Sequence, residues 1–89
     1  MYVREYFNPV LMAANATYAV RGPAIGGFLA KTAGTVSVTA PDNTGLTTAT
    51  YVDAIPVAAG TYLPIPLSFP TGAGGSVILA NGASGTLFV

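Results

Sequence analysis

The 89-residue sequence contains no cysteine and no histidine. Without cysteine there can be no disulfide and no thiolate metal site, and without histidine the commonest acid–base side chain is missing. A chain of this size buries only about 60–65% of the surface that its unfolded form exposes, so its core is small. Small domains without cross-links often gain stability by association, which we expect here.

Charge is also scarce. Charged residues make up 7% of the chain and the formal net charge is zero, whereas an ordinary soluble domain has about 25% charged residues. Hydrophobic residues reach 52%. An isolated domain normally keeps a mixed, charged surface. We therefore expect much of this surface to be covered by copies of the same chain or by a larger partner.

Two classes of partner are not expected. The basic residues Arg4, Arg21 and Lys31 are scattered along the chain, whereas a nucleic-acid site needs clustered lysine and arginine. The most apolar stretch, residues 9–30, is interrupted by arginine, proline and paired glycines. It therefore does not have the pattern of a membrane-spanning helix.

Composition divides the chain into an N-terminal segment, residues 1–24, and a Gly/Thr/Val-rich body, residues 25–89. In the segment, Asn8-Pro9 resembles a helix start, because asparagine caps helices and proline favours the first helical position. This predicts a short helix over residues 9–14. Two alternatives remain open: an extended arm that lies across a neighbour, and an ordinary first strand over residues 2–7.

The body has the pattern of β-structure throughout. "TVSVTA" alternates valine with hydroxyl residues, as a half-buried antiparallel strand does. Turn-forming residues follow at 41–45 and 71–75, and Asn81-Gly82 predicts a tight hairpin. Short strands separated by such turns are typical of a sandwich or barrel. The expected fold is all-β, a small antiparallel β-sandwich or β-barrel with an N-terminal arm or short helix.

The stretch "TYLPIPLSFP", residues 61–70, places prolines inside an alternating strand pattern. Leu63, Ile65 and Leu67 share one face, while Pro64 and Pro66 both remove donors from the opposite side of the backbone. Prolines of this kind protect the open edge of a sheet. We therefore predict an edge strand that pairs only on its leucine side. The alternative is an unpaired polyproline-like connection.

No catalytic, cofactor-binding or metal-binding residues are predicted. The carboxylates are Glu5, Asp42 and Asp53, and acid–base chemistry without histidine usually needs two carboxylates held close together. Asp42 lies in a turn motif and Asp53 in a strand pattern, where ordinary structural roles explain them. The chain is therefore not expected to be an enzyme.

The expected interface residues are aromatic and apolar, because such side chains dominate the buried centre of protein interfaces. Tyrosines at the N-terminus could anchor an arm, and Tyr62 lies on the proline face of its strand. The candidate interface residues are Tyr2, Tyr6, Phe7, Leu11, Met12, Tyr62, Pro64 and Pro66.

Four short pieces carry a family resemblance: "TAG" at 32–34, "VSVT" at 36–39, "AGT" at 59–61 and "LPI" at 63–65. Over residues 26–82 the chain resembles small all-β virion proteins of tailed bacteriophages and related gene-transfer particles. Members of that family tend to carry a basic residue after "LPI", where this chain has Pro66.

The resemblance implies a non-enzymatic structural protein on the outside of a phage capsid. It would act as a decoration or cement protein, or as the base of a spike or fibre. The implied partners are the major capsid protein and further copies of the chain, with a trimer as one candidate assembly, and the implied location is the virion surface. The alternative function is a carbohydrate- or cell-surface-binding fibre module.

Overall fold

The computed structural model describes residues 8–20, 24–41, 47–68 and 74–89. This part of the chain forms eight β-strands and no helix, so none of it could span a membrane as a helix. The strands are β1 (Pro9–Met12), β2 (Thr17–Val20), β3 (Ala24–Thr32), β4 (Gly34–Pro41), β5 (Thr48–Val57), β6 (Tyr62–Ser68), β7 (Gly75–Ala80) and β8 (Ser84–Phe88).

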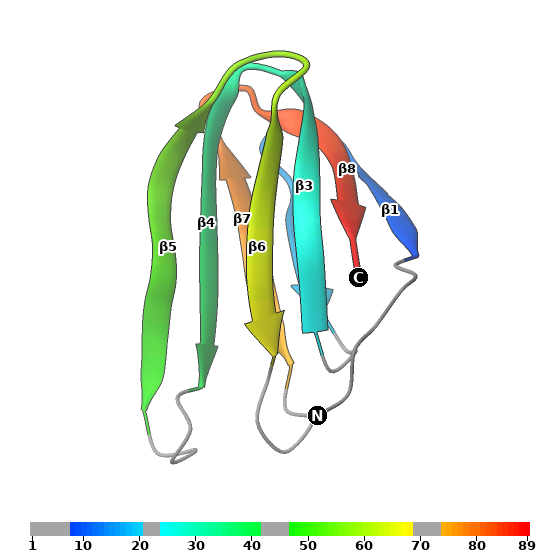
Figure 1. The fold of residues 1–89 in the computed structure, drawn as a ribbon. Helices are drawn as coiled ribbons and strands as arrows, with labels where there is room; N and C mark the ends of the chain where they lie inside the picture. The colour runs from blue at the N-terminus through cyan, green and yellow to red at the C-terminus, as the bar shows by residue number, and fades with distance from the viewer. Residues whose placement is uncertain (1–7, 21–23, 42–46, 69–73) are drawn as a thin grey trace.

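The strands form two four-stranded antiparallel sheets (Figure 1). Sheet A has the order β1-β8-β3-β6, and sheet B has the order β2-β7-β4-β5. The sheets pack face to face as a sandwich, which confirms the predicted all-β fold and selects the sandwich over the closed barrel. Among the described strands β1, β6, β2 and β5 each have one neighbour, so they are the edges of the two sheets.

The alternation of residues in β4 matches its burial. Val36, Val38 and Ala40 are buried, while the hydroxyl residues between them lie on the outer face of sheet B. Since β4 pairs with both β5 and β7, every second side chain faces the opposing sheet. The pattern in "TVSVTA" therefore predicted this strand and its buried face correctly.

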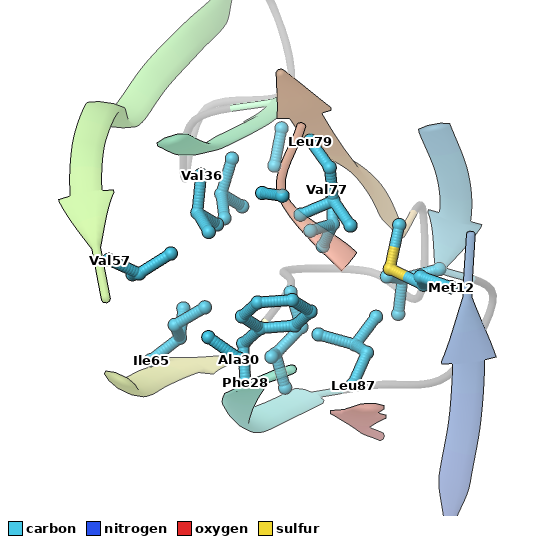
Figure 2. Close-up of a cluster of buried hydrophobic side chains, with 14 residues drawn as sticks. Met12, Phe28, Ala30, Val36, Val57, Ile65, Val77, Leu79 and Leu87 are labelled. Carbon is cyan, nitrogen blue, oxygen red and sulfur yellow. The ribbon is translucent and has the colours of Figure 1, made fainter. Parts of the chain in front are cut away.

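The core is a layer of apolar side chains from both sheets (Figure 2). Phe28 is its largest fully buried side chain, and no polar side chain is buried among the described residues. The buried hydrophobic residues are Met12, Val20, Ile25, Phe28, Ala30, Val36, Val38, Ala40, Val57, Ile65, Val77, Leu79, Ala83 and Leu87.

The predicted helix over residues 9–14 is wrong. Residues Pro9–Met12 form strand β1 at the edge of sheet A, paired with β8. Asn8 and Val89 exchange backbone hydrogen bonds of 2.7 and 2.9 Å just before the strand. Pairing with β8 and burial of Met12 outweigh the local capping signal, because a helix this short has little stability of its own. The alternative strand over residues 2–7 lies outside the described residues.

The Asn81-Gly82 turn forms, but it does not make the predicted hairpin. Both residues have positive φ, 56° and 90°, yet the strands on either side belong to different sheets. The Gly82 N–H donates to the Asn15 side-chain oxygen (2.8 Å), and the Thr32 hydroxyl donates to the Gly82 carbonyl (2.7 Å). The turn therefore contacts Asn15 and Thr32, and it connects β7 in sheet B with β8 in sheet A.

Strand β6 is an edge strand, as the prolines predicted, and within the part of the chain that the structure describes it pairs only with β3. The Ala30 N–H donates to the Thr61 carbonyl (2.8 Å). Thr61 therefore faces β3, and by alternation so does Leu63, while Pro64 faces away from the sheet. The sequence did not predict the irregularity that follows, where Ile25 lies opposite Leu67 but Gly27 lies opposite Pro64. Pro66 falls within this bulge, a position that tolerates proline.

Two isoleucines on neighbouring edge strands test the core. Ile65 is 1% exposed and Ile55 is 39% exposed. We expect Ile65→Ala to lower the free energy of unfolding by roughly 2–5 kcal/mol, because it leaves a cavity between the sheets. Ile55→Ala removes the same atoms from a partly exposed site and should cost about 1 kcal/mol or less. Chemical denaturation measures both, and equal losses would contradict the described core.

A substitution at Pro64 tests the protection of the β6 edge. Pro64→Thr restores an outward N–H, so we expect it to form larger species than the wild type as concentration rises. Pro64→Lys is the matched control, since it restores the same donor but adds a charge that opposes edge pairing. Sedimentation velocity measures the species. If both variants sedimented like the wild type, protection of the β6 edge would not depend on the missing N–H of Pro64.

Candidate interaction surface

The outer face of sheet A carries a row of large side chains. Register pairs place Leu11 opposite Thr86, Thr86 opposite Leu29, and Leu29 opposite Tyr62. Directly opposed residues share a face of a sheet, so this row crosses all four strands. Leu11 is 87% exposed, Leu29 41% and Tyr62 49%.

A second row runs beside the first. Pro9 lies opposite Phe88, Phe88 opposite Gly27, and Gly27 opposite Pro64. Phe88 is half-buried and Pro64 is exposed. Together the two rows form an exposed apolar surface that we call the sheet A patch: Leu11, Leu29, Tyr62, Pro64 and Phe88.

Tyr62 is held in place by its neighbours. The centroid of its ring lies 6.3 Å from the centroid of the Phe88 ring, and the two ring planes are inclined at 57°. The Tyr62 hydroxyl donates to the Gly26 carbonyl (3.3 Å). A Cβ on Gly27 would collide with the Tyr62 ring, so the ring lies close over the glycine backbone. An aromatic side chain that is already fixed loses little entropy when a partner covers it.

The outer face of sheet B differs in chemistry. Residues facing outward from β4 are Thr35, Ser37 and Thr39, and Ser76 lies opposite Thr39 on β7. Ile78 on β7 lies opposite Ser37 and is half-buried, and β5 of the same sheet carries Tyr51 and Ile55, which are 45% and 39% exposed. The two central strands of sheet B therefore present mainly small hydroxyl side chains, whereas sheet A presents large apolar groups on all four strands.

A shallow groove borders the patch on the β1 side, with a volume of about 450 Å³. Its walls include Leu11 and Lys31, with Ser84 and Thr86 between them. Met12 also lines this groove but is only 6% exposed, because its side chain packs into the core. Lys31, Ser84 and Thr86 thus place some polar groups beside the apolar patch.

The predicted interface residues fall into three groups. Leu11, Tyr62, Pro64 and Pro66 are exposed, with the first three on the sheet A patch. Met12 lies in the core. The other candidates, Tyr2, Tyr6 and Phe7, lie outside the described residues.

Sequence reasoning missed Leu29 and Phe88. Leu29 lies shortly after Gly26 and Gly27. Glycine has no side chain, so this part of the sequence shows no alternation from which the outward-facing positions could be predicted. Phe88 belongs to the apolar run "LFV". Apolar and polar residues do not alternate there, so the sequence does not show which side chains face the core. Only the pairing of β8 with β3 decides that Leu87 faces the core and Phe88 faces outward.

Charged side chains are few among the described residues. Their charged side chains are Lys31 and Asp53, on different sheets, and they contain no cluster of potential metal ligands. They also contain no buried polar side-chain atom without a hydrogen-bond partner.

Comparison with known proteins found no matching family model, no similar curated protein and no similar solved structure. The chemistry of the surface therefore has to carry the functional argument.

A double-mutant cycle tests the packing of Tyr62 over Gly27. We expect Gly27→Ala to lower the free energy of unfolding by roughly 1–3 kcal/mol, because the new methyl group collides with the ring. In the Tyr62→Ala background the same change should cost less, although the Leu63 carbonyl, 2.9 Å from the added Cβ, remains close. Chemical denaturation of the four proteins measures the coupling. Additive losses would contradict the described contact.

Proposed function

We propose that this chain is a non-enzymatic virion protein that binds the outside of a phage capsid. It acts as a decoration or cement subunit, or as the base of a spike or fibre. The observation that carries the proposal is the sheet A patch, an exposed apolar surface across all four strands of one sheet. The resemblance of residues 26–82 to small virion proteins supports the choice of a capsid as the partner.

The shape of the molecule suits this role. Its extents are 34 × 28 × 16 Å, so it is a slab whose broad faces are the outer faces of the two sheets. A stable interface buries about 800 Å² on each partner, which is comparable to one broad face of this slab. A slab that lies flat across a capsomer boundary adds buried area there and resists expansion of the shell.

The chemistry of the patch also supports docking. Its residues carry no charge, so binding does not require an ion to be stripped of water, which is a costly step. Tyr62 and Phe88 are already packed against each other, and aromatic groups of this kind dominate the energy of many interfaces. Lys31 at the border of the groove can contribute to orientation at the rim.

Substitution of Leu29 tests this docking surface. Leu29→Lys places a charge in the middle of the sheet A patch, so we expect it to weaken binding to intact capsids at least about tenfold, or ~1.4 kcal/mol. Thr50→Lys is the matched control, because Thr50 is also exposed but lies opposite Thr39 on the outer face of sheet B. Co-sedimentation with purified particles measures the affinity.

Three outcomes would contradict the proposal. The first is a wild-type chain that does not bind particles, and the second is equal loss of binding in the two lysine variants. The third is a reproducible hit on a glycan array, lost in Tyr62→Ala, from a chain that ignores particles. That result would favour a carbohydrate-binding fibre module instead.

A further inference from the structure

The four sheet edges are not equally protected against pairing with another strand. Strand β1 begins with Pro9, and β6 contains Pro64 and Pro66. Strand β5 contains Pro56, a positive φ of 49° at Ala54 and two register shifts. Proline and irregular geometry both discourage the addition of a strand. Only β2, Thr17–Val20, has neither a proline nor a register shift.

The backbone of β2 directs hydrogen-bonding groups away from its own sheet. The Leu79 N–H donates to the Ala16 carbonyl (2.9 Å), so Ala16 and, by alternation, Tyr18 and Val20 face β7. Thr17 and Ala19 therefore direct their N–H and C=O groups away from the sheet. Both residues are exposed, and both side chains are small enough to let another strand approach.

We infer that the β2 edge pairs with the β2 edge of a second copy of this chain. An antiparallel arrangement places Thr17 opposite Ala19 of the second copy, and Ala19 opposite its Thr17. Each pair exchanges two backbone hydrogen bonds, so four bonds form around a two-fold axis. The two B sheets then continue as one eight-stranded sheet.

Tyr18 completes the self-complementary surface. In this register Tyr18 lies opposite the same residue of the second copy, as a closely spaced pair without mutual backbone bonds. Its side chain points to the inner side of sheet B, half-buried against the core. The two rings therefore meet on the inner side of the joined sheets. No charged residue lies on β2 to oppose the contact.

Two-fold pairing produces a dimer and not the trimer suggested by the family resemblance. The contact is small, four backbone bonds and two tyrosines, so the dimer is a weak one. The inference does not depend on capsid binding. It uses an edge of sheet B, whereas the proposed docking surface lies on sheet A.

Removal of one donor tests the inference. The wild-type chain of 8.9 kDa should sediment at twice that mass as concentration rises. Ala19→Pro removes an outward N–H and spares the bonds to β7, so we expect the dissociation constant to rise at least about tenfold. Ala19→Ser is the matched control, since it keeps the N–H and should dimerise like the wild type.

Charge pairs test the register. Thr17→Lys/Ala19→Lys places like charges opposite each other and should separate the two copies, whereas Thr17→Lys/Ala19→Glu places opposite charges together and should keep the dimer. Circular dichroism verifies that each variant is folded. A wild-type chain that is monomeric up to about 1 mM, a trimer, or an Ala19→Pro variant that dimerises normally would overturn the inference.

The two proposals can fail separately. Leu29→Lys should retain the dimer even where it loses capsid binding, because Leu29 lies on the other sheet. A dimer that ignores particles would overturn the proposed function alone. A particle-binding monomer would overturn the β2 pairing alone.

Discussion

The contact between the two sheets, through one layer of apolar side chains, is the constraint on which the rest of this molecule depends. The chain has no disulfide, and the described residues bury no polar side chain. Stability must therefore come from burial of residues such as Phe28, Val36 and Leu87, whose side chains enter the same layer from different sheets (Figure 2). Every strand is thereby required to keep one face toward this layer, and the opposite face is left for solvent or partners.

That requirement explains how the two outer faces can diverge. Once the inward positions are apolar, the outward positions of each strand are free to vary. The central strands β4 and β7 of sheet B carry small hydroxyl residues outward, whereas sheet A carries Leu11, Leu29 and Tyr62. A monomeric domain rarely gathers many large apolar side chains on one exposed face without a use for them. The difference between the faces, and not any single residue, is the main argument for a docking surface on sheet A.

Edges are the second consequence of building the molecule from two open sheets. An open sheet exposes backbone groups at its edges, where another strand could pair. Three of the four described edge strands contain proline, which discourages such pairing. The edge without proline, β2, is thereby distinguished from the other three. A protein with so few charges cannot rely on repulsion to prevent association, so the placement of its prolines controls which edges remain available.

The sequence by itself determined the class of the fold and several of its parts. Strict alternation predicted β4 and its buried face, and the missing donors of "LPIP" predicted the edge position of β6, because both signals are local properties of the backbone. Of the interface residues that it predicted, Leu11, Tyr62, Pro64 and Pro66 are exposed, and Met12 is buried in the core.

Tertiary structure alone decided the rest. Pairing with β8 turned residues 9–12 into a strand despite a helix-capping signal, and it set the orientation of Phe88 within an apolar run. The assignment of β7 and β8 to different sheets made the Asn81-Gly82 turn a crossing connection. These outcomes depend on contacts between residues far apart in the chain. A local pattern can specify that a residue is extended, but not which strand it will lie beside.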